Sequence, residues 1–175
     1  MPEPRRRVAT SSRIRREREY RTTLLWQIAL AGYMQLISWL PLGRWNYQPC
    51  CPTGLELLRR GTLSVSDAVG TTAFLLPLAL FWLGARRDWA WAMWLALAAT
   101  TIWLGLQLWT WWPPYLFGAS ERWSQVYARA FAQSTSILPR WGSHLPPDAA
   151  HFALQVLLSG SVATGGMALV RRRQR

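Results

Sequence analysis

The chain has 175 residues, a formal net charge of +12 and a hydrophobic content of 51%, and all twenty of its basic residues are arginine. Its apolar residues gather in four stretches without Asp, Glu, Lys or Arg, each close to the roughly twenty residues that a helix needs to cross a bilayer. This composition excludes an ordinary soluble domain. It predicts an all-α integral membrane protein, built as a bundle of four transmembrane helices.

An arginine-rich segment, residues 1–22, precedes the first apolar stretch and holds eight arginines. A basic segment beside a membrane is attracted to anionic lipid by about 1 kcal/mol per arginine. No motif of a nucleic-acid-binding fold is present, so we interpret the charge as a membrane signal and expect no nucleic-acid partner. The first span is expected at 23–42. Its length and the lack of a small-residue cleavage site favour a retained helix over a cleaved signal peptide.

The loop 43–67 follows and contains both cysteines, Cys50 and Cys51, as direct neighbours. Neighbouring cysteines form a disulfide within one chain only with strain, and the Cys-x-x-Cys spacing of redox enzymes is absent. Free thiols, metal ligands or a bond to a second chain stay open, with a structural or intermolecular role favoured. The segment 53–60, which is followed by Gly61, is expected to form a short amphipathic helix.

Two further spans are expected at 68–85 and 89–112, joined by a tight turn that contains Arg86 and Arg87. Pro77 lies within the second span, where it removes a backbone hydrogen bond and should kink the helix. Small residues at every fourth position allow close approach of neighbouring helices in lipid. These small residues are Ala92, Ala96 and Thr100 in the third span, and Ser161 and Gly165 in the fourth.

The second loop, 113–148, is long and rich in aromatic residues, so we expect it to be folded. Ser120 is a favourable helix cap, and the residues after it place their aromatic side chains on one helical face. We therefore predict a short amphipathic helix over 121–133, lying on the membrane surface or over the mouth of the bundle. The aromatic residues of this face are Trp123, Tyr127 and Phe131.

The fourth span is expected at 149–170, and a short basic segment, 171–175, ends the chain. Fourteen of the twenty arginines lie before the first span, in the turn between the second and third spans, or after the fourth. The positive-inside rule then predicts that both termini are cytoplasmic, and that the loops 43–67 and 113–148 are external. The arginine-only, tryptophan-rich composition suggests a bacterial chain, which would lie in the cytoplasmic (inner) membrane.

Three glutamines lie within the spans at similar depth, near the external ends of the helices: Gln35, Gln107 and Gln155. Amides in lipid form interhelical hydrogen bonds worth about 0.6 kcal/mol on average. The alternative is a polar cavity open to the outside, because polar groups within a membrane tend to mark functional sites.

The chain's two histidines, His144 and His151, flank the start of the fourth span. Asp148 is expected to cap this helix, with His151 one turn later on the same face. Two imidazoles and a carboxylate suit zinc or another divalent metal, or acid–base chemistry with Glu121 as a further candidate base. The structural alternative is a helix cap beside a hydrogen-bonding histidine.

Three functions stay open at this point. The first is a binding or assembly module that displays its external cap to a second copy of the chain or to another membrane protein. The second is a metal-dependent or acid–base enzyme with its site at the outer interface. The third is a small transporter subunit, which ranks last because the spans hold no Asp, Glu, Lys or Arg to couple transport to an ion.

Overall fold

The computed structural model of the chain describes residues 4–46 and 52–174, with side chains from Tyr20 onward. Within these ranges the chain forms seven α-helices, one short 3-10 helix (η1, Gly43–Trp45) and two isolated β-bridges, and it contains no β-strand. Cys50 and Cys51 lie outside the described residues. The all-helical class predicted from the sequence is confirmed.

The first helix, α1 (Pro4–Trp39), joins the arginine-rich segment and the first predicted span in one continuous helix. It ends before the predicted limit of the span because a side chain from the following turn satisfies its last carbonyl groups. The Asn46 amide donates to the carbonyl oxygens of Ile37 and Leu40, both at 2.8 Å. An asparagine placed just after a helix thus ends α1.

The short helix predicted after the cysteines is present as α2 (Gly54–Arg60). It begins with a capping box, in which the backbone N–H of Thr53 donates to the Glu56 carboxylate at 2.8 Å. The Thr53 hydroxyl donates to the same carboxylate at 3.0 Å, and these two hydrogen bonds lower the pKa of the Glu56 carboxyl below its usual value. Gly61 ends the helix in the left-handed region, with φ of 68°, which a glycine adopts without steric cost.

The second predicted span is broken into α3 (Val65–Thr72) and α4 (Leu75–Arg87), which are bent by 47° relative to each other. Pro77 accounts for the break, because proline has no N–H to donate to the carbonyl of Ala73 one turn earlier. That carbonyl accepts from the N–H of Leu76 instead, at 3.0 Å. The expected kink is therefore present, one turn before the proline itself.

The helix α5 (Ala90–Phe117) is longer than the third predicted span and continues through Pro113 and Pro114. The helix therefore extends beyond residue 112, where the third span was expected to end. Tyr115 fixes this end of the helix, because its buried ring packs against Trp112 and Trp141, with centroids 6.1 and 5.9 Å away. Aromatic packing thus holds a helical end that two prolines would otherwise weaken.

The helix α6 (Glu121–Ala130) is the predicted amphipathic helix, and the Ser120 hydroxyl caps it by accepting from the Trp123 N–H at 3.2 Å. It ends before the expected limit of residue 133, because Phe131 leaves the helix to pack against other rings. The last helix, α7 (Ala149–Arg173), begins directly after Asp148, as predicted.

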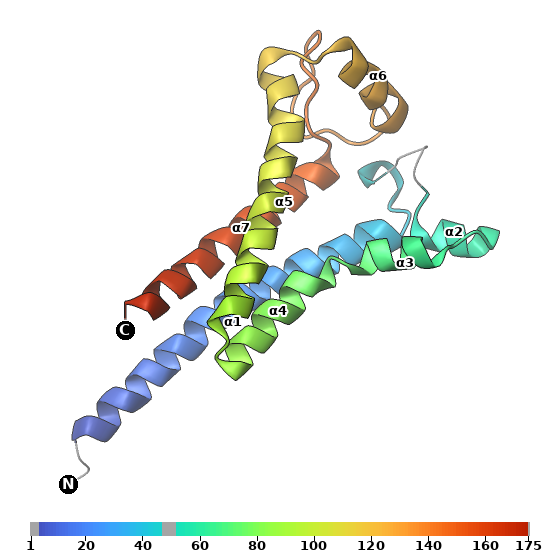
Figure 1. Cartoon of the computed structure of the whole chain (residues 1–175). Coiled ribbons are helices and arrows are strands. Elements are labelled where there is room, and N and C mark those ends of the chain that lie inside the picture. The colour runs from blue at the N-terminus through green and yellow to red at the C-terminus, as the bar shows by residue number, and fades with distance from the viewer. Residues whose placement is uncertain (1–3, 47–51, 175) are drawn as a thin grey trace.

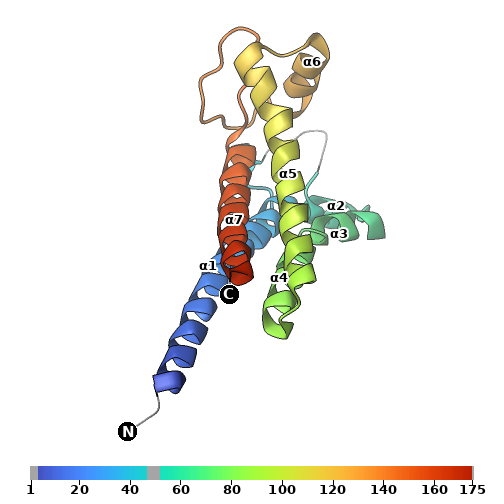
Figure 2. The same ribbon diagram turned by 60° about the vertical axis from the view of Figure 1, so that its left-hand side comes forward.

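The helices α1, α4, α5 and α7 pack against one another, and α7 contacts both α1 and α5 (Figures 1 and 2). The end that carries the α4–α5 turn and the last turn of α7 is here called the tail end. At the opposite end α5 diverges from α1 and α3, and residues 118–148 fold over its last turns (Figure 1). We call residues 118–148 the cap, and this end the cap end.

Small residues line the contact between the helices. Ala92, Ala96, Thr100 and Ser161 are at most 1% exposed, which confirms the predicted contact faces of α5 and α7. A Cβ added to Gly165 would touch side chains of both α1 and α5 at ordinary van der Waals distance. One added to Gly160 would overlap the Trp26 indole ring, so this glycine sets how closely α7 approaches α1.

Two helices, α5 and α7, are long and apolar enough to cross a membrane, and the bent pair α3–α4 adds a third if it counts as one span. The helix α1 does not meet the same criterion among the described residues. Its second half contains Gln27 and Gln35, which lower its mean hydropathy. The chain therefore has two or three candidate membrane helices, and the fourth crossing stays a prediction.

Candidate functional site: a cleft beside the cap

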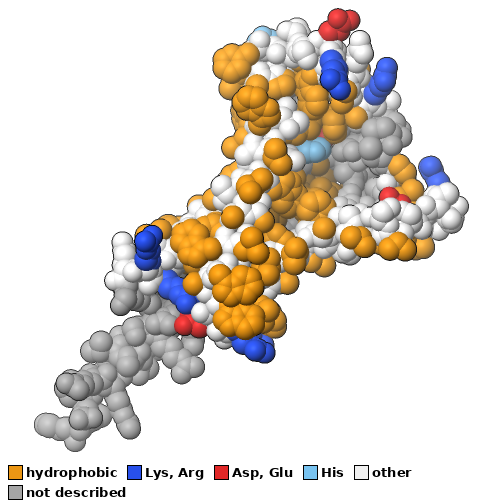
Figure 3. Space-filling view, in the orientation of Figure 1, with side chains coloured by type: hydrophobic (Ala, Val, Ile, Leu, Met, Phe, Trp, Pro, Cys, Tyr) orange, Lys and Arg blue, Asp and Glu red, His pale blue; other side chains and the backbone are white. Residues whose placement is uncertain are grey.

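A cleft of about 350 Å³ opens at the cap end, where α5 diverges from α1 and α3. Its walls come from the end of α1, the residues that follow it, the α3–α4 break, α5 and the first turns of α7. Figure 3 shows the hollow between the cap and the arm made by α2 and α3, with a histidine at its floor. The bend at Ala73–Phe74 helps to form the cleft, since a straight helix would not place the same residues along its wall.

The apolar wall of the cleft centres on an aromatic pair. Phe74, at the start of α4, stacks on Trp103 of α5, with ring centroids 4.6 Å apart and an interplanar angle of 18°. Met34 and Leu154, which belong to a buried cluster between α1 and α7, continue this surface. A flat apolar platform is therefore available to a ligand.

Asp148 and His151 form the polar floor. The Oδ1 atom of Asp148 accepts from the backbone N–H of His151 at 2.7 Å and from its ring Nδ1 at 2.8 Å. A carboxylate is only an acceptor, so in a neutral imidazole this contact places the proton on Nδ1 and leaves the lone pair on Nε2. Asp148 is 1% exposed, whereas the His151 side chain is 21% exposed and lines the cleft.

Two aromatic rings, one from α5 and one from the cap, fix the orientation of the His151 imidazole. Trp111 lies with its centroid 4.6 Å from the imidazole, and Phe131 lies 5.4 Å away, edge to face. Trp111 is in turn surrounded by Trp123 and Tyr127 of α6. The cap therefore determines how His151 is presented to the cleft.

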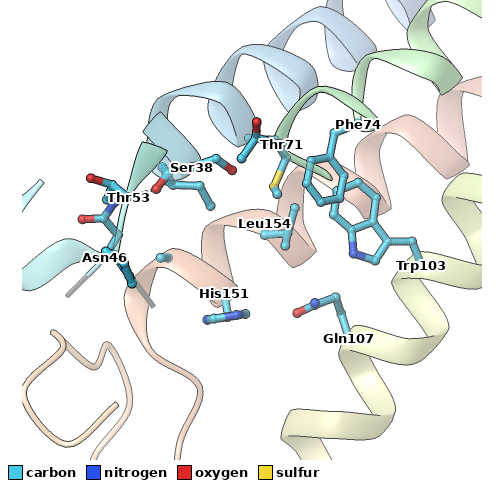
Figure 4. Close-up of a pocket in the computed structure, with 13 residues that line it drawn as sticks. Ser38, Asn46, Thr53, Thr71, Phe74, Trp103, Gln107, His151 and Leu154 are labelled. Carbon is cyan, nitrogen blue, oxygen red and sulfur yellow. Dashed lines mark hydrogen bonds between the residues drawn. The ribbon is translucent and has the colours of Figure 1, made fainter. Parts of the chain in front are cut away.

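Gln107 supplies a second polar group from α5. Its Oε1 atom is buried and has no hydrogen-bond partner among the described residues. Figure 4 shows the Gln107 amide and the His151 ring directed toward the same space. A buried acceptor without a donor is costly, by about 1–3 kcal/mol, and calls for an explanation such as a bound group. Asp148 Oδ2 and Gln155 Nε2 are also buried without a partner among the described residues, but of these three residues Gln107 is the one that lines the cleft.

The other two glutamines have partners of their own. The Gln35 amide donates to the carbonyl oxygen of Thr71 at 2.6 Å and so joins α1 to α3. The Oε1 atom of Gln155 accepts from the Trp112 indole N–H at 2.9 Å and joins α7 to α5. Of the three glutamines expected to share a cavity, the structure places Gln107 in the cleft wall.

His144 and Glu121 lie apart from the Asp148–His151 pair. The Nδ1 atom of His144 is 2.8 Å from the carbonyl oxygen of Tyr115, and its ring packs edge to face on Trp141. Glu121 is exposed in the first turn of α6. The described residues contain no group of three or more His, Cys, Asp or Glu side chains that could hold a metal ion. The geometry thus brings together two of the four predicted site residues.

Burial and charge also act on Tyr127 in the cap. Desolvation raises the pKa of its phenol above the usual value, and the negative charge of Asp148 raises it further. Arg140, whose guanidinium lies 5.8 Å from the centroid of this ring, opposes the shift. The side chains near Asp148 thus experience a negative local field.

Sequence reasoning missed the aromatic pair and a polar clamp. The Tyr33 hydroxyl donates to the carbonyl oxygen of Ala150 at 2.7 Å and accepts from the Trp45 indole N–H at 3.2 Å. These contacts tie α1 to the first turn of α7, beside the cleft. A tyrosine in an apolar span predicts such a hydrogen bond, because a buried hydroxyl group needs a partner.

Comparison with protein-family models, with curated proteins and with solved structures finds no match to this chain. The chain is an all-helical protein with two or three candidate membrane helices and a cap-end cleft that holds an Asp148–His151 pair.

Proposed function

We propose that the chain is a four-span protein of the bacterial cytoplasmic membrane with both termini cytoplasmic, and that its external cap end is a binding module. The tail end carries Arg86, Arg87 and Arg171–Arg173, while the helices between the two ends are almost free of charge. The positive-inside rule assigns this tail end to the cytoplasm. The second half of α1 lies in the same bundle and provides the fourth crossing.

The cleft then faces the outer side of the membrane and takes a small amphipathic ligand. A volume of about 350 Å³ and a mainly apolar wall with a few polar groups are typical of small-molecule sites. The buried Oε1 of Gln107, which lacks a donor, carries the proposal. Gln107 Oε1 and His151 Nε2 are both acceptors, so the ligand bears hydroxyl or amino donors. Its apolar part lies on Phe74 and Trp103.

A neutral lipid with free hydroxyl groups provides the test. The protein is reconstituted in phosphatidylcholine nanodiscs with a monoacylglycerol that carries a photoreactive diazirine, and labelled peptides are mapped by mass spectrometry. We expect labelling of α5 and α7 residues beside the cleft, and a severalfold loss in Gln107→Leu, which keeps the side-chain size and removes the acceptor.

Thr110→Val, one turn away on the exposed side of α5, is the matched control and should label like wild type. Equal labelling of wild type and Gln107→Leu, or labels spread over the exposed faces of the helices, would overturn the proposed ligand. Thermal unfolding of each variant verifies that the fold is intact.

A second function is favoured by the Asp148–His151 contact. An aspartate that accepts a hydrogen bond from Nδ1–H leaves Nε2 as an oriented general base. A histidine activates water or a hydroxyl group in this arrangement. The same reconstituted protein then releases fatty acid from the monoacylglycerol, and His151→Gln abolishes the release. Labelling without release assigns binding alone, whereas release that persists in His151→Gln excludes this base.

A further inference from the structure

A second cavity, also of about 350 Å³, lies at the tail end between the first turn of α5 and the last turns of α7. Ala90 and Trp94 of α5 and Leu169 of α7 form its apolar side, and Arg172 and Arg173 form its cationic rim. No residue is shared with the cap-end cleft. We call it the tail groove.

Arg172 is held in a fixed position at the rim. Its Nη2 lies 3.0 Å from the Asp88 carboxylate and donates to the backbone carbonyl of the same residue at 2.9 Å. Its Nη1 lies 3.6 Å from the sulfur of Met93. Asp88 is in the left-handed region, with φ of 58°, at the turn that joins α4 to α5. A guanidinium has five N–H donors, so Arg172 keeps donors for a second acceptor.

Arg173 supplies the charge that Asp88 does not neutralise. Its side chain is exposed and forms no ion pair among the described residues. Asp88 is the single acidic residue in the sequence of α4, the turn, α5 and α7. Two neighbouring guanidinium groups beside one carboxylate leave a net positive rim, which is complementary to a phosphate group.

The apolar side of the groove suits an acyl chain or a glycerol backbone rather than a free anion. Trp94 is 46% exposed and lies about one helical turn from the start of α5, near the depth at which tryptophan marks a membrane interface. Two neighbouring tryptophan rings also contact arginines. The Arg86 guanidinium carbon lies 4.4 Å from the centroid of the Trp82 ring, and the Arg87 guanidinium carbon lies 5.8 Å from that of Trp89. In Figure 3 this end shows aromatic side chains between basic ones.

We propose that the tail groove binds one anionic phospholipid of the cytoplasmic leaflet. Its phosphate accepts hydrogen bonds from Arg172 and Arg173, and the glycerol region and the upper acyl chain lie against Trp94 and Leu169. Basic pockets between helices on the cytoplasmic side have the chemistry to hold such headgroups. The site rests on the proposed membrane orientation, and it is independent of the ligand in the cap-end cleft.

Native mass spectrometry of the delipidated, detergent-bound protein tests the site, with phosphatidylglycerol titrated against phosphatidylcholine. We expect phosphatidylglycerol to bind at least about fivefold more tightly, and Arg173→Gln to lower its affinity by about fivefold, the usual effect of one interfacial arginine. Arg86→Gln removes the same charge from the same end without touching the groove, and it should change the affinity by less than about twofold.

Ala90→Phe gives an independent variant, because it fills the groove and leaves every charge in place. It should weaken phosphatidylglycerol binding by about fivefold or more while far-ultraviolet circular dichroism stays unchanged. Equal losses in Arg86→Gln and Arg173→Gln would show diffuse attraction and overturn the site. Equal affinity for the two lipids, full binding by Ala90→Phe, or displacement of the lipid by millimolar inorganic phosphate would overturn it as well.

Discussion

The cap end and the tail end of this protein are stabilised in different ways. At the cap end, hydrogen bonds connect distant parts of the chain: Thr135 N–H donates to the Arg44 carbonyl at 2.7 Å, and Ala149 N–H to the Thr135 carbonyl at 2.6 Å. Buried rings fill the space between them. The tail end has a tight turn, an exposed ion pair between Asp88 and Arg172, and a buried cluster of apolar side chains such as Phe81 and Leu169. Directional, buried contacts fix a shaped cleft, whereas exposed charges provide attraction that salt screens.

Removing Trp111, the ring of α5 against which the cap packs, should have the largest effect on stability. Trp111 is 2% exposed and packs against Trp123, Tyr127, Phe131 and His151. Trp111→Ala should lower the free energy of unfolding by about 3–5 kcal/mol, because it leaves a large cavity. Denaturant unfolding in detergent, followed by tryptophan fluorescence, measures the loss.

Trp109→Ala is the matched control on the same helix, because Trp109 is 77% exposed. It should cost less than about 0.5 kcal/mol. Similar losses of stability in the two variants would mean that the packing around Trp111 adds no more stability than an exposed ring.

The N-terminal capping residue of α7, Asp148, should have the next largest effect on stability. Asp148→Ala removes an acceptor from the His151 backbone N–H and from its ring, and should destabilise the fold by about 2 kcal/mol. Asp148→Asn keeps a capping oxygen, so its loss of stability should be clearly smaller. Hydrogen exchange at the first turn of α7 locates the change. Unaltered hydrogen exchange in Asp148→Ala would contradict the capping role of Asp148.

At the tail end the expected change is small. Asp88→Asn removes the ion pair with Arg172, and asparagine tolerates the left-handed backbone of this position. The Asp88 side chain is 69% exposed, so we expect a loss of at most about 1 kcal/mol, and less in 1 M salt. A loss as large as that of Trp111→Ala would remove the contrast between the two ends.

The smallest effect concerns pH. Tyr127 has a raised pKa in the folded cap, so the folded state holds its proton to higher pH than the unfolded chain, whose tyrosines titrate near about 10. The protein therefore loses stability as the pH rises above about 10, and keeps this contribution below it. The free energy of unfolding of Tyr127→Phe should decline less steeply than that of wild type between pH 9 and 11 in the same unfolding assay. Parallel curves would contradict a titration at Tyr127.

Local signals in the sequence predicted several parts of the fold well. Ser120 and Asp148 are placed as helix caps by their chemistry and by the apolar pattern after them, and the structure has helices beginning there. The limits of α5 and α6 were not predictable in this way. Local rules end a helix near Pro113 and extend one to residue 133, but the packing of Tyr115 and Phe131 overrides both.

The candidate site likewise combines contacts that local sequence predicts with contacts that only tertiary packing produces. The i, i+3 spacing of Asp148 and His151 predicts their contact, because residues one turn apart share a helical face. His144 is close in sequence, yet it binds the carbonyl of Tyr115. Phe74 and Trp103 meet only because the bend before Pro77 brings the start of α4 to α5. Nothing in the order of residues along the chain indicates that pair.

The sequence by itself determined the helical class, the amphipathic helix of the cap, the start of α7 and the gathering of arginine at one end. These follow from local patterns: apolar length, capping side chains and charge. Only the tertiary structure decided that Gln107 and His151 share a cleft, that Gln35 and Gln155 bond elsewhere, and that Arg172 meets Asp88. Such pairs lie far apart in the chain, and helix crossing and bending bring them together.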